Sequence, residues 1–255
     1  MWIALLFALG AGLSTTVGSL IGIIVKKPGP KFMSFTLGFS AGIMIFVSFV
    51  ELLAKAIQTV GFLRSNLAFF IGMGTYFFVD LLLPHEYIGQ HDYPQDKYDR
   101  MDEGMRRLER TGLLVAIGIS VHNFPEGIAT FVGTLEDRNL GLAIAVAIAI
   151  HNIPEGLAIS APVYAATGSR KKAFFWSFLS GVSEVVGASL AALFLMPFLS
   201  ESLMGYVLAV VAGIMVVISL DEIIPAAKSF PSEHMPLFGM MAGMALMMVS
   251  LWMLK

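Results

Sequence analysis

Two copies of the pattern His-Asn-x-Pro-Glu-Gly stand 29 positions apart, at 122–127 and 151–156. Residues three and four positions apart lie on one face of a helix, so the His and the Asn of each copy flank its Glu. Imidazole nitrogen combined with carboxylate and amide oxygen suits Zn²⁺, Fe²⁺, Mn²⁺ or Co²⁺, whereas oxygen alone more often holds Ca²⁺ or Mg²⁺. The candidate metal ligands are His122, Asn123, Glu126, His151, Asn152, Glu155 and a further acid, Glu184.

The composition indicates that the elements holding these residues belong in a membrane. Hydrophobic residues make up 57% of the 255 and charged residues 13%, whereas soluble domains carry about 25% charged residues. The mean hydropathy is +0.81. The net charge of -2 leaves no basic excess for binding nucleic acid. The absence of cysteine excludes a disulfide framework and a thiolate metal site.

A helix needs about 20 apolar residues to cross the hydrocarbon of a bilayer. The sequence predicts an all-α membrane protein with eight transmembrane helices in a single domain, 1–255. The predicted spans are Trp2–Val25, Phe32–Ile57, Phe62–Leu83, Gly112–Thr134, Leu140–Tyr164, Ala173–Leu195, Leu203–Ile224 and Met235–Leu254. The first span lacks a basic n-region and is too long for a typical signal peptide, so we expect it to be retained.

The distribution of basic residues predicts the orientation, because cytoplasmic loops retain Lys and Arg. Twelve of the 16 Lys and Arg lie in the first, third, fifth and seventh connections, and four lie on the other side. Both termini are therefore expected outside. The longest connection, 84–111, is expected to be a solvated cytoplasmic loop.

Three glutamates, Glu126, Glu155 and Glu184, lie deep inside predicted spans, where a charge costs from about 2.5 to more than 10 kcal/mol depending on the method. No Lys or Arg lies deep in any span, so these glutamates must be protonated or neutralised by a bound cation. Other acids lie nearer span ends: Glu51, Asp80, Asp221 and Glu222. Glu51 and the Asp221-Glu222 pair either guide ions at an entrance or exit or simply reach water.

Each copy of the pattern carries a proline, Pro125 or Pro154, which removes a backbone hydrogen bond and kinks a helix. Broken backbone at membrane depth is tolerated only where protein buries it or where it lines a cavity. Consecutive spans run antiparallel, so the two copies can face one another about a pseudo-two-fold axis. Kinked helices four and five are therefore predicted to form a mid-membrane metal site. Two ions are a hypothesis: one beside His122 and His151, the other beside Asn123, Asn152 and Glu184, with Glu126 and Glu155 bridging.

Small residues recur at a spacing that lets helix backbones approach closely. The pairs are Gly18 with Gly22, Gly38 with Gly42, and Gly239 with Gly243. Packing between helices of one chain is the favoured interpretation, and a dimer contact is the other.

The doubled motif, together with Ser180-Gly-Val-Ser-Glu184 and Asp221-Glu-Ile-Ile-Pro-Ala-Ala227, resembles the ZIP (Zrt/Irt-like) metal transporters, and among them the bacterial ZupT-type branch. The resemblance covers the whole chain. It implies uptake of divalent metal across a bacterial plasma (inner) membrane into the cytoplasm, with the seven candidate residues matching the family's metal-binding positions. It also implies an elevator-like mechanism, in which spans one, four, five and six move against the others, and a homodimer.

The resemblance leaves two points open. Some family members carry Asp or Gln where this chain has Asn152 and His151, so the preferred metal is not fixed. Family loops often carry more histidine than His85 and His91, which either bind metal on the exit side or are ordinary solvated residues.

Two other functions remain open from the sequence. An intramembrane metal-dependent hydrolase would use the metal to activate water, but the His-Glu-x-x-His helix typical of such enzymes is absent. A receptor or scaffold with a structural metal is the second, and the surplus of carboxylates argues against it. A duplicated site favours a pathway open to both faces. No catalytic residue or catalytic cofactor is therefore predicted, and Cd²⁺ is expected to substitute for the transported ion.

Overall fold

The computed structural model describes residues 1–25, 29–81, 116, 120, 123–198, 200–228, 230 and 232–254. These residues contain helices and no strand. The α-helices are α1 (Trp2–Val25), α2 (Pro30–Val47), α3 (Ala54–Val60), α4 (Phe62–Asp80), α6 (Arg138–Thr167), α7 (Arg170–Leu190), α8 (Glu201–Ile218), α9 (Ile224–Lys228) and α10 (Met235–Leu254). Residues 123–136 are also helical. The remaining turns are the π-helical η1 (Ser48–Leu53), η2 (Ala191–Leu195) and η4 (Ser219–Ile223) and the 3₁₀ turn η3 (Met196–Phe198).

The all-α prediction is confirmed for the described residues, in which six helices are long and apolar enough to cross a membrane. α1 and α10 have the predicted bounds. Two predicted spans are not among these six helices. The predicted span 62–83 corresponds to α4, which ends at Asp80, and the predicted span 112–134 is described as continuous helix from residue 123 onward. The count of eight spans stays a prediction. The predicted loop 84–111, with His85 and His91, lies outside the described residues.

Capping side chains decide where the helices of the site begin. The Asp137 carboxylate accepts hydrogen bonds from the backbone N–H groups of Asn139 and Leu140, both at 2.9 Å, and starts α6. α6 ends at Gly168, whose φ of 62° is a left-handed conformation that glycine adopts without strain. The Ser169 hydroxyl then accepts from the N–H of Lys172 and starts α7. Both helices begin before the predicted apolar spans, because their first turns are polar.

A second internal repeat was missed by the sequence analysis. Ala41-Gly-Ile-Met44 in α2 recurs as Ala212-Gly-Ile-Met215 in α8, 171 positions later. Each copy leads into a π-helical turn that starts with a serine, Ser48 or Ser219, and contains a glutamate at the same place. Each serine hydroxyl donates to the carbonyl of the methionine four residues earlier, at 2.7 Å. The two segments therefore share the same local structure.

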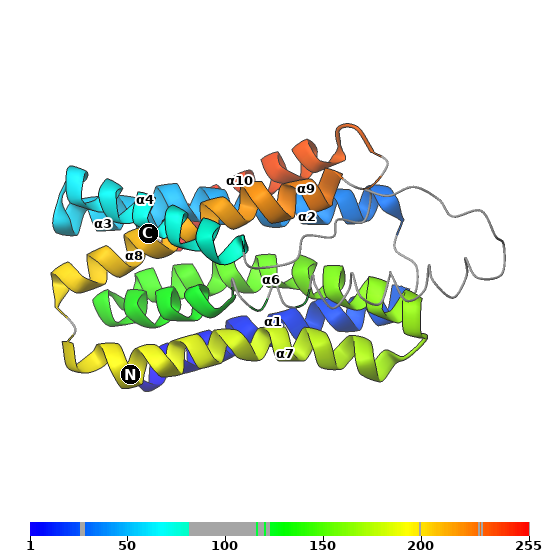
Figure 1. The fold of residues 1–255 in the computed structure, drawn as a ribbon, viewed down its shortest axis with the longest axis horizontal. Coiled ribbons are helices and arrows are strands. Elements are labelled where there is room, and N and C mark those ends of the chain that lie inside the picture. The colour runs from blue at the N-terminus through cyan, green and yellow to red at the C-terminus, as the bar shows by residue number, and fades with distance from the viewer. Residues whose placement is uncertain are drawn as a thin grey trace.

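The helices pack as two groups, which Figure 1 shows along opposite sides of the bundle. The α6 group consists of α1, residues 123–136, α6 and α7; α1 packs most extensively on α6 and α7. The α2 group consists of α2, α3, α4, α8, α9 and α10, with α2 packed on α10 and α4 on α8. Both termini lie at the same end of the bundle (Figure 1).

Glycines bring helix backbones into contact inside each group, which confirms the prediction of packing within the chain. A methyl group added at Gly18 would lie 1.9 Å from the Ile153 carbonyl oxygen, and one added at Gly38 would lie 2.2 Å from that of Pro236. The same close approach occurs at Gly42, Gly239 and Gly243 between α2 and α10, and at Gly72 and Gly213 between α4 and α8. Every such backbone contact of a described glycine joins helices of one group.

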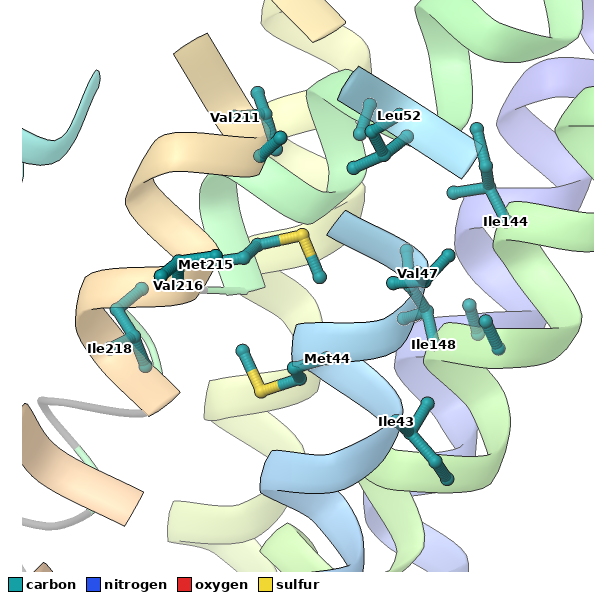
Figure 2. Packing of buried hydrophobic residues seen from close by; sticks show 14 of the residues in the cluster. Ile43, Met44, Val47, Leu52, Ile144, Ile148, Val211, Met215, Val216 and Ile218 are labelled. Carbon is teal, nitrogen blue, oxygen red and sulfur yellow. The ribbon is translucent and has the colours of Figure 1, made fainter. Parts of the chain in front are cut away.

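The contact between the two groups is made by aliphatic side chains instead. Figure 2 shows α2 between α8 and α6, with Met44 beside Met215 on one side and Ile43 and Val47 turned toward α6 on the other. These residues are at most 1% exposed, as is Ile148 of α6. The contact of α2 with α6 at these positions is therefore apolar, and the Ser40–Glu155 hydrogen bond and the Lys55–Glu136 ion pair also cross between the groups.

Candidate metal centre

Six of the seven predicted metal ligands are described, and each is buried. Asn123, Glu126, His151, Asn152 and Glu184 are 0% exposed and Glu155 is 1% exposed. They come from the helix at 123–136, from α6 and from α7. His122 lies outside the described residues. α6 continues through Pro154 without interruption, and the predicted kink stays a prediction.

One contact joins the two copies of the motif directly. Glu126 Oε1 lies 3.0 Å from Nε2 of His151, so an acid of the first copy meets the imidazole of the second. Both side chains are fully buried. The two helices therefore face one another at these positions, as the antiparallel arrangement predicts.

The amide of Asn152 is oriented by two acceptors on neighbouring helices. Its Nδ2 donates to the carbonyl oxygen of Ala11 in α1 at 3.0 Å and to Oε2 of Glu184 in α7 at 2.9 Å. Because a backbone carbonyl can only accept, the nitrogen must point toward Ala11. The Oδ1 atom of Asn152 then points away and is available to a cation.

Asn123 is held in the same way on the opposite side. Its Nδ2 donates to the carbonyl oxygen of Ser180 in α7 at 3.2 Å and lies 3.4 Å from the hydroxyl of that residue. Both asparagines are therefore anchored through nitrogen on a backbone carbonyl, with oxygen left over. An amide oxygen is a ligand for a metal ion, whereas an amide nitrogen is not.

Four buried oxygen atoms accept no hydrogen bond from any residue that the structure describes. These four belong to the candidate ligands and are Oδ1 of Asn123, Oε2 of Glu126, Oδ1 of Asn152 and Oε1 of Glu184; other buried oxygens without a described partner, such as Oγ1 of Thr15, are hydroxyls or lie outside the candidate set. A buried polar atom without a partner costs about 1–3 kcal/mol. No Lys or Arg is buried among the described residues, so neither neutralises the three glutamates there. A bound cation would satisfy both requirements.

Glu155 is bound from the other group. Ser40 of α2 donates from Oγ to Oε1 of Glu155 at 3.1 Å, and the same hydroxyl lies 3.5 Å from the carbonyl oxygen of His151. Ser40 was not among the predicted site residues, since a lone serine in an apolar span gives no signal. Its position directly before the repeated Ala41-Gly-Ile-Met44 segment is the one feature that could have drawn attention to it.

The described side chains do not yet make a closed ligand set. Within the described ranges, no three His, Asp or Glu residues form a group that could hold one ion. The residues are instead brought together as two pairs, Glu126 with His151 and Asn152 with Glu184. The asparagines are not among those three residue types, and His122 lies outside the described part. The arrangement supplies imidazole nitrogen on one side and amide and carboxylate oxygen on the other, which suits a divalent transition metal.

Three of the acids that the sequence places nearer the span ends lie on π-helical turns. Glu51 is in η1, and Asp221 and Glu222 are in η4. The Tyr76 hydroxyl of α4 donates to Oε1 of Glu222. Glu222 is therefore held inside the α2 group.

Known proteins resemble this chain over most or all of its length. The family model described as ZIP Zinc transporter matches residues 83–251. Proteins named zinc transporter ZupT are 50% identical in Oceanobacillus iheyensis, over 100% of this chain and 98% of that protein, and 48% identical in Chlorobium phaeovibrioides, over 98% and 97%. The protein of that name in Streptococcus mutans is 45% identical, over 94% of this chain and 93% of its own. The chain therefore belongs to the ZIP family of integral membrane transporters and to its ZupT-type branch.

Proposed function

We propose that this protein takes up a divalent transition metal, zinc first, into the cytoplasm through the site between residues 123–136, α6 and α7. The observation that carries the proposal is the set of buried carboxylate and amide oxygens without a basic counter-ion. A resident Lys or Arg would leave no need for a cation, and neither is buried there among the described side chains; the imidazole of His151 beside Glu126 carries a positive charge only when protonated. The relatives named zinc transporter support zinc as the cargo. Fe²⁺, Mn²⁺ and Co²⁺ suit the same ligand types.

The direct test is uptake of Zn²⁺ into proteoliposomes. Glu126→Ala and Glu155→Ala are expected to abolish uptake without loss of folding, because each removes an acid that neutralises the ion. Glu233→Ala is the matched control, since Glu233 is exposed and remote in sequence from the motifs. Undiminished uptake by both site variants would refute the assignment. Competition by Fe²⁺, Mn²⁺, Co²⁺ and Cd²⁺ in the same vesicles would rank the metals.

Two ions are proposed for the site. The pair of Glu126 with His151 offers nitrogen and carboxylate, and the pair of Asn152 with Glu184 offers amide and carboxylate oxygen. Two ligand groups on opposite sides favour two positions, with Glu126 and Glu155 between them. Equilibrium titration of the purified protein is expected to show two equivalents, falling to one in Glu184→Ala. A single equivalent in both proteins would contradict this.

The packing of the helices supports an elevator-like motion of the α6 group against the α2 group. Backbone contacts at glycines hold each group together internally, whereas aliphatic side chains meet between the groups. Side-chain contacts can re-form with new neighbours, whereas close backbone contacts at small residues fix the spacing of two helices. We place both termini outside, at a bacterial inner membrane, on the distribution of Lys and Arg. A homodimer is proposed on the family resemblance.

The chain contains no cysteine, which makes this motion accessible to cross-linking. Cysteines placed at Lys55 and Glu136, whose side chains pair across the groups at 3.2 Å, can be joined by a short thiol reagent. The cross-link is expected to stop uptake reversibly. Uptake that continues at the normal rate in the fully cross-linked protein would argue against a sliding motion.

A further inference from the structure

We propose that Thr15 of α1 contributes a neutral oxygen to the metal site, at the position that corresponds to Glu184 of α7. The inference rests on the proposed function of the site and adds a residue to it. It starts from a likeness between two segments, Ala11-Gly-Leu-Ser-Thr-Thr-Val-Gly18 and Ser180-Gly-Val-Ser-Glu-Val-Val-Gly187. Aligned without gaps, both have glycine, serine, valine and glycine at the same four places, and Thr15 stands against Glu184.

The two segments make the same contacts with the two copies of the His-Asn-x-Pro-Glu-Gly motif. A methyl group added at Gly18 would lie 1.9 Å from the carbonyl oxygen of Ile153, and one added at Gly187 would lie 2.1 Å from that of Phe124. Ile153 and Phe124 are the same position of the motif. α1 therefore packs on the second copy as α7 packs on the first.

The reverse contacts obey the same relation and involve the two aligned residues themselves. A methyl group added at Gly156 would lie 1.9 Å from the carbonyl oxygen of Thr15, and one added at Gly127 would lie 1.9 Å from that of Glu184. The backbones of Thr15 and Glu184 thus occupy equivalent places against the two motifs.

The anchors of the asparagines are related in this way too. The Ala11 carbonyl accepts from Asn152 Nδ2 and from the Ser14 hydroxyl. The Ser180 carbonyl accepts from Asn123 Nδ2 and from the Ser183 hydroxyl. α7 packs on the first motif, but the side chain of Glu184 reaches across to Asn152 of the second motif. By the same relation, the side chain of Thr15 in α1, which packs on the second motif, is directed toward Asn123 of the first.

Side-chain positions agree with this placement. A Cβ added at Gly12 would lie 3.6 Å from Cβ of Glu184, and one added at Gly181 would lie 3.4 Å from Cβ of Thr15. Both side chains therefore leave the backbone at the crossing of α1 and α7, on either side of the same axis.

The Thr15 hydroxyl is buried and makes no hydrogen bond to a described residue. Thr15 is 0% exposed, and its Oγ1 has no hydrogen-bond partner in the described part of the chain. Other helical hydroxyls donate to the carbonyl four residues earlier, as Ser48 does. For Thr15 that carbonyl is Ala11, which already accepts two hydrogen bonds. Asn123 Oδ1, on the side that Thr15 faces by symmetry, is likewise without a described partner.

This placement makes the site unequal in charge. A carboxylate stands beside one asparagine, and a hydroxyl stands at the corresponding place beside the other. A fourth acid would hold a divalent ion more tightly and release it more slowly. The neutral oxygen of Thr15 therefore contributes to coordination while limiting affinity, which a transporter requires.

The test compares purified wild type, Thr15→Val, Thr15→Ser and Thr16→Val by equilibrium titration with Zn²⁺ and by thermal unfolding. Thr15→Val keeps the volume and removes the oxygen, and is expected to weaken Zn²⁺ binding about 10–100-fold without lowering the unfolding temperature. Thr15→Ser should bind as wild type. Thr16→Val is the matched control, since Thr16 Oγ1 also lacks a described partner but aligns with Val185. Binding by Thr15→Val equal to that of wild type would overturn the proposal.

A second variant tests the charge argument. Thr15→Glu is expected to bind Zn²⁺ more tightly than wild type and to lower kcat for uptake, because release is slowed. Weaker binding by a folded Thr15→Glu would contradict the symmetric placement. Glu126→Ala distinguishes a failure of the proposed site from a failure of the role of Thr15. If wild type and Glu126→Ala bind Zn²⁺ with equal affinity, the proposed site is refuted. If Glu126→Ala binds more weakly but Thr15→Val binds as wild type, only the role of Thr15 is refuted.

Discussion

Replacing Gly18 of α1 by alanine tests the helix contact on which the geometry of the proposed metal site depends. The added methyl group would lie 1.9 Å from the carbonyl oxygen of Ile153, whereas side-chain carbons do not come closer than 3.0 Å to such atoms. α1 and α6 must therefore separate by at least about 1.1 Å at this point. Overpacking of this kind costs about 1–3 kcal/mol.

The cost is expected to lower the unfolding temperature by about 2–12 °C, at about 2–4 °C for each kcal/mol in a chain of this size. Thermal unfolding in detergent measures it. Gly10→Ala is the matched control in the same helix, since a methyl group at Gly10 meets nothing within 4 Å. It should leave the unfolding temperature unchanged or raise it, because alanine favours a helix by about 0.5–1 kcal/mol over glycine.

The same separation has a consequence for metal binding. Asn152 Nδ2 lies 3.0 Å from the Ala11 carbonyl across these two helices, and a shift of about 1.1 Å would take it beyond hydrogen-bond distance. A net hydrogen bond contributes about 0.5–1.5 kcal/mol, so Zn²⁺ should bind about 2–10-fold more weakly to Gly18→Ala. An unfolding temperature and an affinity equal to those of Gly10→Ala would refute the contact between α1 and α6.

Three further changes have expected outcomes of different kinds. Ser40→Ala removes the hydroxyl that donates to Glu155 of α6, so the free energy of unfolding of the metal-free protein should fall by about 1–3 kcal/mol. A free energy of unfolding equal to that of wild type would contradict the contact. Glu136→Gln breaks the ion pair with Lys55, in which the side chain of Glu136 is 14% exposed and that of Lys55 is 30% exposed. Because the pair is partly exposed, the uptake rate should change no more than about fivefold. Exchanging the two charged residues should restore the uptake rate. Asn152→Asp removes the amide that donates to Glu184 and places two carboxylates together, so the metal-free protein should unfold at a temperature about 3–12 °C lower. Zn²⁺ should raise the unfolding temperature of this variant more than that of wild type. An equal rise in both proteins would contradict binding of the ion on the side of Asn152 and Glu184.

Much of the proposed site could be predicted from the sequence because its signal is local. Helical spacing puts the His, Asn and Glu of each motif on one face of a helix, and the repetition of the motif after 29 positions predicts a second helix with the same residues on one face. The absence of basic residues near the deep glutamates is visible without coordinates. Glu126, Asn152 and Glu184 were predicted in this way, and the structure places them among buried neighbours of the expected types.

Other features could be read only in part. The second repeat, Ala41-Gly-Ile-Met44 with Ala212-Gly-Ile-Met215, was present in the sequence, but short apolar identities are common in membrane spans and carry little weight alone. The likeness of the Thr15 and Glu184 segments is weaker still. It gained meaning once reciprocal contacts at Gly156 and Gly127 showed that the two segments occupy equivalent places.

The sequence by itself determined the apolar helices, the seven candidate ligands and the shortage of positive charge around the acids, since composition and periodicity act within one helix. Only the tertiary structure decided the partners. It placed Asn152 against Ala11 and Glu184, brought Ser40 from the other group to Glu155, and divided the helices into two groups. A helical pattern specifies which face is polar or small, whereas the neighbour that covers this face is fixed by the close packing of all the helices together.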